Sequence, residues 1–281
     1  MHLAKLHGLG NDFLVLVDLD DTTPVDAGLA AALCDRHRGI GADGLIRVSP
    51  GGGGADVTMV LRNADGGMAE MSGNGIRCLA LAVARHRGVS TLELRVATGG
   101  GVRDVRLTTG HGGLAHVEVD MGKARPGPEP DTGWLSLPVT ANLLEGPEGQ
   151  YPGLSTLDVG NPHLVVLVDD PAAVDLAEAG PVAEQQFTGG INVGFVAPVA
   201  GQPDALELRV WERGAGITEA CGTGATAAAH AAHEWGLVGE HVTVHLTGGD
   251  VQVSIGDTLT LSGPAVHVAD CFVEDDTLRW R

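Results

Sequence analysis

A duplicated motif is the sequence feature that most constrains the fold of this chain. The segment "MSGNGIRC" at residues 71–78 returns as "ACGTGATA" at residues 220–227, which aligns Ser72 with Cys221 at an offset of 221 − 72 = 149. Other landmarks recur in the same order at offsets of 149 to 151: Asn63 with Glu212, Gly67 with Gly216, Glu70 with Glu219, Asn11 with Asn161, and Gly39-Ile40 with Gly190-Ile191. Because order and spacing are both kept, internal duplication explains the pattern better than coincidence among glycine-rich turns. The duplication predicts two similar α/β halves, each a curved sheet around one helix.

The helix of each half is predicted by a long segment that is rich in alanine or leucine and free of proline. These segments are residues 73–88 and 222–236, and each ends at a glycine, Gly88 or Gly236. Short runs of β-forming residues alternate with turns elsewhere and predict strands. Residues 122–138 are rich in proline and glycine, which predicts a connector between the halves.

Composition and charge exclude several function classes. The formal net charge is −19 and the only lysines are Lys5 and Lys123, so neither a nucleic acid nor an anionic membrane is an expected partner. No apolar run approaches the ~20 residues that span a bilayer, and the N-terminus lacks a signal-peptide core. The four cysteines are far apart and lack CxxC spacing, which favours reduced thiols and a cytoplasmic location.

The repeated motif predicts a carboxylate site at each helix start. Ser72 taken alone is explained as an N-cap. As a pair, however, two helix N-termini with exposed N–H groups and adjacent glycines suit a carboxylate held from two sides. One side chain would then lie on each face of the neighbouring carbon, where an amino-acid α-proton is removed from one face and another is returned to the opposite face. A thiol at a helix N-terminus, such as Cys221, is expected to have a lowered pKa.

The same region carries polar residues that suit an amino-acid ligand. Asn11, Asn63, Asn161 and Asn192 flank turns, where asparagine is also a common turn former. Arg213, next to Glu212, suits a bidentate clamp on a second carboxylate; a surface ion pair is the alternative. His163 suits a role in orienting or deprotonating a neighbour, although a buried structural histidine would have the same sequence signature. We find no metal-ligand cluster, dinucleotide fingerprint or lysine near these motifs, so no metal and no cofactor are expected.

The motifs together resemble those of the diaminopimelate epimerases. The matching stretches are "KLHGLGNDF", "RHRGIGADGL", "NADGGMAEMSGNGIRC", "VGNPHLVV", "INVGFV", "VWERGAGITEACGTGA" and "LSGPAVHVAD". The resemblance implies an α/β (α+β) fold of two duplicated barrel-like halves, each a curved, mainly antiparallel sheet around a central helix. It implies domains at 1–125, joined by a C-terminal strand at 270–281, and at 126–269, with the active site in the cleft between them. It further implies a homodimer and a cofactor-independent epimerase that interconverts LL- and meso-diaminopimelate in lysine and peptidoglycan precursor synthesis.

Site residues carry over from the family by motif. Cys221 matches one catalytic cysteine, with Glu212 as its partner, and His163 matches the residue paired with the other cysteine. The positions that bind substrate in the family are matched by Asn11, Asn63, Asn161, Asn192, Glu212 and Arg213. The helix starts that hold the substrate carboxylate in the family are matched by Gly73-Asn74 and Gly222-Thr223.

The departure from the family pattern is Ser72, which stands where the family has its other cysteine. An alcohol loses its proton near pKa ~15.7 and a thiol near ~8.5, so Ser72 is a poor base unless it relays a proton with His163. Cys78 is expected to be a packed apolar thiol that cannot replace it. Three interpretations stay open: a working epimerase, a one-base racemase or dehydratase acting on another amino acid, and an inactive amino-acid-binding paralogue.

Overall fold

The chain divides into two compact units in a computed structural model that describes residues 1–133, 135–139 and 153–274. Unit 1 comprises Met1–Asp120 together with the C-terminal residues from Ser262, and unit 2 comprises Met121–Leu261. The expected C-terminal strand at 270–281 is replaced by a strand that begins earlier and ends at Phe272, and residues 275–281 lie outside the described residues.

Unit 1 contains two helices and a curved sheet. Its elements are β1 (His2–Gly8), β2 (Asn11–Val17), α1 (Ala27–Cys34), β3 (Gly44–Pro50), β4 (Val57–Asn63), β5 (Met68–Ala69), α2 (Gly73–Arg87), β6 (Thr91–Thr98), β7 (Gly101–Thr109), and most of β8 (Leu114–Gly122) and of β17 (Leu259–Phe272), whose remaining residues belong to unit 2. Most neighbouring strands pair antiparallel, while β2–β3 and β4–β6 are parallel. The last strand, β17, pairs with β1 and β8.

Unit 2 repeats this arrangement. Its elements are β9 (Arg125–Pro126), β10 (Leu154–Asp158), β11 (Pro162–Leu167), the 3-10 helix η1 (Pro171–Ala173), α3 (Leu176–Glu184), β12 (Asn192–Pro198), β13 (Ala205–Glu212), β14 (Gly216–Thr218), α4 (Gly222–Glu234), β15 (His241–Leu246) and β16 (Gly249–Ile255). The pairings again alternate, with β11–β12 and β13–β15 parallel and the other hairpins antiparallel. Strand for strand, the order matches unit 1, so the structure confirms the predicted duplication and the fold class.

The strand registers relate a further pair of residues in the two units. Phe13 is paired with Gly44 between β2 and β3, and His163 is paired with Asn192 between β11 and β12. The offset of 150 that relates Asn161 to Asn11 also relates His163 to Phe13. The counterpart of Asn192 in unit 1 is therefore Gly44, at an offset of 192 − 44 = 148. The segment from Ile40 to Gly44 is therefore three residues longer than the segment from Ile191 to Asn192, and the strand registers do not test the alignment of Gly39-Ile40 with Gly190-Ile191, because these residues lie in loops.

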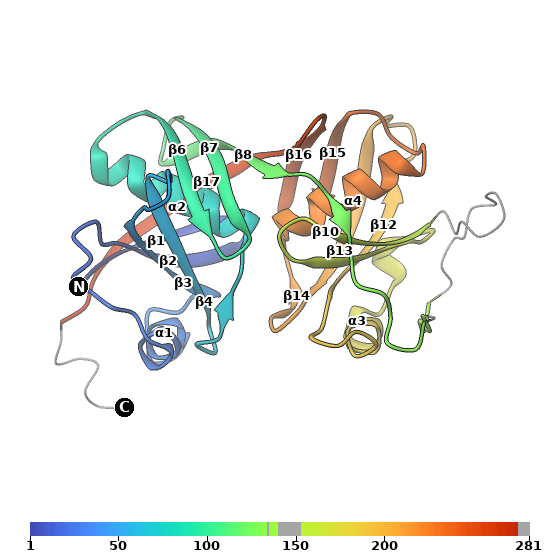
Figure 1. The fold of residues 1–281 in the computed structure, drawn as a ribbon, viewed down its shortest axis with the longest axis horizontal. Helices are drawn as coiled ribbons and strands as arrows, with labels where there is room; N and C mark the ends of the chain where they lie inside the picture. Colours follow the sequence, from blue (N-terminus) through green and yellow to red (C-terminus); the bar gives the residue numbers. More distant parts are fainter. Residues whose placement is uncertain (134, 140–152, 275–281) are drawn as a thin grey trace. The chain divides into compact units, whose positions relative to one another are not determined.

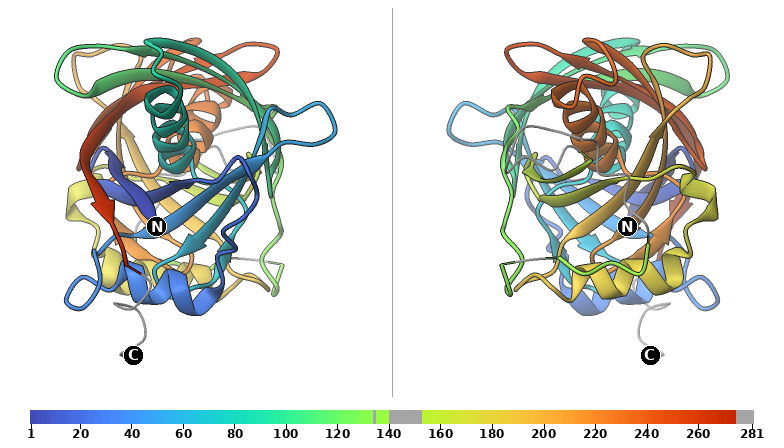
Figure 2. Two further views of the ribbon diagram at one scale, coloured as in Figure 1. Left: turned by 90° about the vertical axis from the view of Figure 1, so that its left-hand side faces the viewer. Right: turned by 90° about the vertical axis from the view of Figure 1, so that its right-hand side faces the viewer.

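A helix lies inside the curved sheet of each unit (Figures 1 and 2). Helix α2 packs against β1–β4, β6 and β7, and α4 packs against β10–β13, β15 and β16. Every residue of α2 from Gly73 to Ala84 is buried, so this helix is enclosed on all sides over three turns. Both predicted helices are confirmed, including their ends: Gly88 is the left-handed C-cap of α2, and Gly236 follows the last turn of α4 with φ 75°.

The shorter helices cover the outside of each sheet. Helix α1 packs on β3 and β4, and α3 packs on β12, β13 and β14. Phe187 and Phe195 belong to the apolar cluster beneath α3, while Leu33 and Leu45 belong to the one beneath α1. Among the described residues, no helix combines the length and apolar character needed to cross a membrane.

Candidate active site

Cys221 stands at the first turn of α4, with its backbone extended and its side chain turned back to cap the helix. Its Sγ accepts a hydrogen bond from the backbone N–H of Gly224 at 3.3 Å and lies 3.4 Å from the Thr223 hydroxyl oxygen. Only 3% of the residue is exposed. The predicted helix-start geometry of Cys221, Gly222 and Thr223 is thus present within unit 2.

The charge state expected for Cys221 is wrong for this structure. Burial and the neighbouring Glu212 carboxylate raise the pKa of the Cys221 thiol well above its usual range, and the contacts with Thr223 and Gly224 only partly offset them. The helix N-terminus is worth at most ~2 kcal/mol to a thiolate. Cys221 is therefore a neutral thiol here, with Glu212 close enough to accept its proton.

Glu212 and Asn192 are held by their neighbours at the same end of the sheet. Glu212 ends β13 and accepts a short hydrogen bond from the Thr218 hydroxyl. Asn192 begins β12; its Nδ2 donates to the carbonyl of Pro162 at 2.9 Å, and its Oδ1 accepts from the backbone N–H of Arg213 at 3.0 Å. The Asn192 side chain therefore fixes the backbone that carries Arg213.

His163 is buried beside Asn192 and is neutral. Its Nε2 lies 3.0 Å from Oδ1 of Asn161, and the residue is 2% exposed. Burial, reinforced by the positive charge of Arg213, lowers the pKa of His163 to about 3. Because an amide oxygen only accepts, Nε2 carries the proton and Nδ1 remains the basic nitrogen. The guanidinium of Arg213 donates to the Gly189 carbonyl at 3.2 Å.

Ser72 occupies in unit 1 the place that Cys221 occupies in unit 2. Its Oγ accepts from the backbone N–H of Gly75 at 3.0 Å and caps α2. Cys78 is completely buried within α2, and burial raises the pKa of its thiol to about 12. Cys78 is thus the packed thiol that the sequence predicted.

Asn11 and Asn74 contact each other through their side-chain amides. Asn74 Nδ2 donates to Asn11 Oδ1 at 3.1 Å, and Asn11 Nδ2 donates to Asp43 at 2.8 Å. Asn74 is 1% exposed and Gly73 is buried, so hydrogen bonds within the protein hold the first turn of α2 in place. Asn63 ends β4, the place that Glu212 has in β13, and is paired with Gly44 across β3 and β4.

Sequence reasoning missed the acidic cluster that supports Asn11. Asp12 pairs with Lys5 at 2.9 Å and with Arg36 at 2.7 Å, and Arg36 also pairs with Asp43 at 2.7 Å. Burial acts to raise the pKa of Asp12, but hydrogen bonds from Arg36 and Lys5 outweigh it and lower the pKa. The signal in the sequence was an aspartate directly after Asn11 and a second one in "GADG", each beside a predicted turn.

Gly44 and Asn192 distinguish the two units. A Cβ atom on Gly44 would lie 2.8 Å from the carbonyl oxygen of Arg62, so this position admits no side chain without movement of the backbone. Unit 1 therefore has no amide where unit 2 has Asn192, and the polar groups of the two units are not equivalent.

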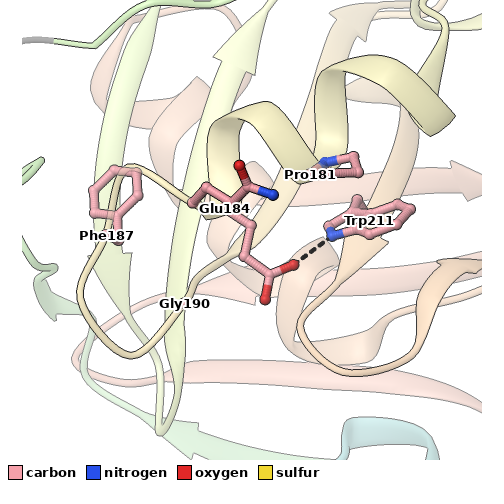
Figure 3. A pocket seen from close by; sticks show the side chains of 6 residues that line it. Pro181, Glu184, Phe187, Gly190 and Trp211 are labelled. Carbon is pink, nitrogen blue, oxygen red and sulfur yellow. Dashed lines mark hydrogen bonds between the residues drawn. The ribbon is translucent and has the colours of Figure 1, made fainter.

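A surface pocket of about 380 Å³ lies beside α3 in unit 2 (Figure 3). It is lined by Pro181, Glu184, Gln185, Phe187, Gly190 and Trp211. The Trp211 Nε1–H donates to Glu184 at 2.6 Å and ties β13 to α3. None of the predicted site residues lines this pocket, so we assign it no part in the site.

Comparison with known proteins gives consistent matches over nearly the whole chain. Residues 3–126 and 155–268 match the family model described as diaminopimelate epimerase. The chain is 41% identical to the diaminopimelate epimerase of Pelotomaculum thermopropionicum, over 95% of this chain and 97% of that protein. It is 42% identical to the diaminopimelate epimerase of Synechococcus elongatus, over 95% and 96% respectively.

Solved structures with lower identity share the fold. A structure described as a predicted epimerase, PA4716, of Pseudomonas aeruginosa has a TM-score of 0.72 at 19% identity and covers 97% of this chain and 98% of that one. A hydroxyproline epimerase from Agrobacterium vitis has a TM-score of 0.69 at 13% identity and covers 96% and 91%.

Proposed function

Because this chain belongs to the diaminopimelate epimerase family, we propose that it interconverts LL- and meso-diaminopimelate by moving the α-proton between opposite faces of the carbon. The observation that carries the proposal is the pair of equivalent helix N-caps, Ser72 and Cys221, in two halves of identical topology. The reaction needs no cofactor, since one group removes a proton and the other returns one.

Cys221 acts as one acid–base group with Glu212 as its partner. The raised pKa keeps the thiol neutral, so it can deliver a proton without a prior step. To remove a proton it must first pass its own to Glu212, whose carboxylate is held by the Thr218 hydroxyl. The N–H groups at the start of α4 then stabilise charge that develops on the substrate carboxylate.

Ser72 acts as the other acid–base group with the help of His163. A free alkoxide would cost on the order of 10 kcal/mol more than a thiolate, given ~7 pKa units at ~1.36 kcal/mol each. A neutral imidazole that takes the serine proton during the transfer lowers that cost without removing it, because no free alkoxide forms. His163 is neutral in this structure and can accept a proton, but the burial that lowers its pKa to about 3 also makes it a weak base.

The remaining predicted residues bind the amino acid. Amide groups of Asn11, Asn63, Asn161 and Asn192 suit the ammonium and carboxylate groups, and the two helix starts, Gly73-Asn74 and Gly222-Thr223, suit the α-carboxylate. Arg213 suits the distal carboxylate, because a guanidinium binds a carboxylate bidentately.

The active enzyme is a cytoplasmic homodimer. Exposed apolar side chains on β17, Val268 and Phe272, and the stacking of His2 on Phe272 support an interface along this strand. Size-exclusion chromatography with light scattering should give twice the 28.7 kDa chain mass. A monomer at micromolar concentration would contradict this assignment.

Proton NMR in D2O tests the reaction directly. Incubation of LL- and meso-diaminopimelate with the protein should replace the α-proton by deuterium and bring both samples to the same isomer ratio. Exchange with retention in one isomer only would mean that Cys221 removes and returns the proton and that the Ser72 face is inactive. Absence of exchange in both isomers would favour the two alternatives, a one-base racemase or dehydratase acting on another amino acid and an amino-acid-binding protein.

A further inference from the structure

Arg77 is the largest fully buried side chain in the part of the chain that the structure describes. It lies in α2, five residues after Ser72, and donates from three nitrogens to three neutral acceptors. Nη1 donates to the Gly73 carbonyl at 3.0 Å, Nη2 to Asn74 Oδ1 at 2.7 Å, and Nε to the Pro264 carbonyl at 3.2 Å. Arg77 forms no ion pair with the described residues.

The guanidinium nevertheless remains charged. Burial lowers the pKa of Arg77 to about 10, which still leaves it protonated at neutral pH. The next residue, Cys78, supplies no negative charge, since burial raises the pKa of that thiol to about 12. A buried cation without a partner anion is unfavourable. The energetic balance improves when an anion binds nearby.

The equivalent residue in unit 2 shows what anchoring the helix alone requires. Thr226, at 226 − 77 = 149, is also completely buried, and its hydroxyl donates to the Gly222 carbonyl at 2.9 Å. Gly222 is the counterpart of Gly73, so both units tether the first carbonyl of the central helix. In unit 2, which contains Cys221, a neutral hydroxyl is enough to hold this carbonyl. In unit 1, which contains Ser72, a positively charged guanidinium holds the equivalent carbonyl.

Arg77 also determines how two predicted binding amides are oriented. Since Nη2 can only donate, it turns Asn74 Oδ1 towards itself and leaves Asn74 Nδ2 to donate to Asn11 Oδ1. Asn11 Nδ2 is then directed to Asp43. Gly8 permits the close approach, because a Cβ atom there would be 3.0 Å from Arg77 Nη2.

We propose that Arg77 is a positioning residue of the Ser72 unit, which fixes the Asn74–Asn11 amides and supplies positive charge behind the α2 N-terminus for a bound substrate carboxylate. This inference rests on the proposed function. Two unit charges ~8 Å apart at an effective dielectric constant of ~20 attract each other by an amount equivalent to roughly 30-fold in affinity. The charge has the same favourable effect on negative charge that develops at Ser72 during proton transfer.

The test compares Arg77→Gln, Arg77→Lys and Thr226→Val by calorimetric titration with meso-diaminopimelate, after circular dichroism has established folding. R77Q, which keeps a donor but loses the charge, should bind about 30-fold more weakly. R77K and T226V should bind within about threefold of the wild type. A folded R77Q that binds within twofold of the wild type, or a T226V that loses as much as R77Q, would overturn the proposal.

The pH dependence of substrate binding by R77K separates a charge role of residue 77 from a purely structural one, because only a charge role would make binding depend on the protonation of the lysine. Burial lowers the pKa of a lysine, so the ratio of R77K to wild-type dissociation constants should rise between pH 7 and pH 9. A constant ratio would overturn the charge role even if R77Q fails to fold. Wild-type protein that binds meso-diaminopimelate without exchanging its α-proton would overturn the proposed reaction alone. Absence of binding by the wild type would overturn both.

Discussion

Replacing Ser72 by cysteine is the most direct test of how the two units share the chemistry. Ser72 and Cys221 cap their helices with the same geometry, at 3.0 and 3.3 Å from the N–H three residues on, so a sulfur atom fits the position of the Ser72 oxygen. Sulfur is the weaker acceptor, and we expect S72C to lose up to about 1 kcal/mol of stability, the usual value of a serine N-cap.

The effect on rate should be much larger and of opposite sign. The pKa difference between alcohol and thiol, ~7 units, corresponds to ~10 kcal/mol for complete proton loss. If about half of it is expressed in the transition state, the barrier falls by ~5 kcal/mol, which is between three and four orders of magnitude in rate. S72C should therefore exchange the α-proton that faces residue 72 at least about 1,000-fold faster than the wild type.

Initial rates of deuterium incorporation from each isomer, measured by proton NMR in D2O, give this number directly. Ser72→Ala is the matched control, because it removes the hydroxyl without supplying a thiol and should abolish exchange on that face. If S72C folds, binds meso-diaminopimelate as the wild type does and yet exchanges within threefold of the wild-type rate, the conclusion that serine limits the reaction is refuted.

Three further predictions concern single residues. Cys221→Ser should slow exchange of the α-proton that faces residue 221 by at least about 1,000-fold in the same NMR assay, for the same pKa reason. When it is introduced into S72C, exchange of the α-proton that faces residue 72 should remain measurable. His163 has a folded pKa of about 3 against ~6.5 unfolded, so the unfolded chain binds the extra proton and wild-type stability falls as pH drops from 6.5 towards 3. In urea titrations, the loss between pH 7 and pH 4 should be ~3 kcal/mol smaller in H163Q; an unchanged slope would contradict a buried neutral imidazole. Burial acts to raise the pKa of Asp18, but hydrogen bonds from Arg47 and the loop backbone lower it to about 2. Its contribution is therefore complete above pH ~3.8 and is lost as pH falls through 2, so D18N should cost roughly 2 kcal/mol at pH 7 and progressively less below pH 4, whereas Asp20→Asn, at an exposed position, should cost little at either pH.

Much of the architecture followed from the repeat. The two central helices, their glycine ends and the equivalence of Ser72 with Cys221 were all predicted from the sequence, because enclosed helices have continuous apolar composition and distinct caps. Helices α1 and α3 were not predicted. They are short, and α3 contains Pro181, which works against a helical assignment from local sequence.

The candidate site was predictable by residue type and less so by environment. Local sequence motifs identified the asparagines, Glu212, Arg213 and His163, because these residues lie beside turns and strand ends. The state of each group depended on neighbours distant in sequence. Cys221 is a neutral thiol because burial and Glu212 outweigh the helix N-terminus, and Asp12 is ionised because Lys5 and Arg36 converge on it.

The sequence by itself determined the duplication, the two helix starts and the chemical groups available at each, because these are encoded by local spacing and caps. Only the tertiary structure decided which groups are charged and which are equivalent. It buried Arg77 without an ion pair among the residues that the structure describes, and it placed a neutral Thr226 at the same position of the other unit. It also made Gly44 of unit 1 the structural counterpart of Asn192 in unit 2. The physical reason is that burial and electrostatic interactions depend on distances between segments that the order of residues does not specify.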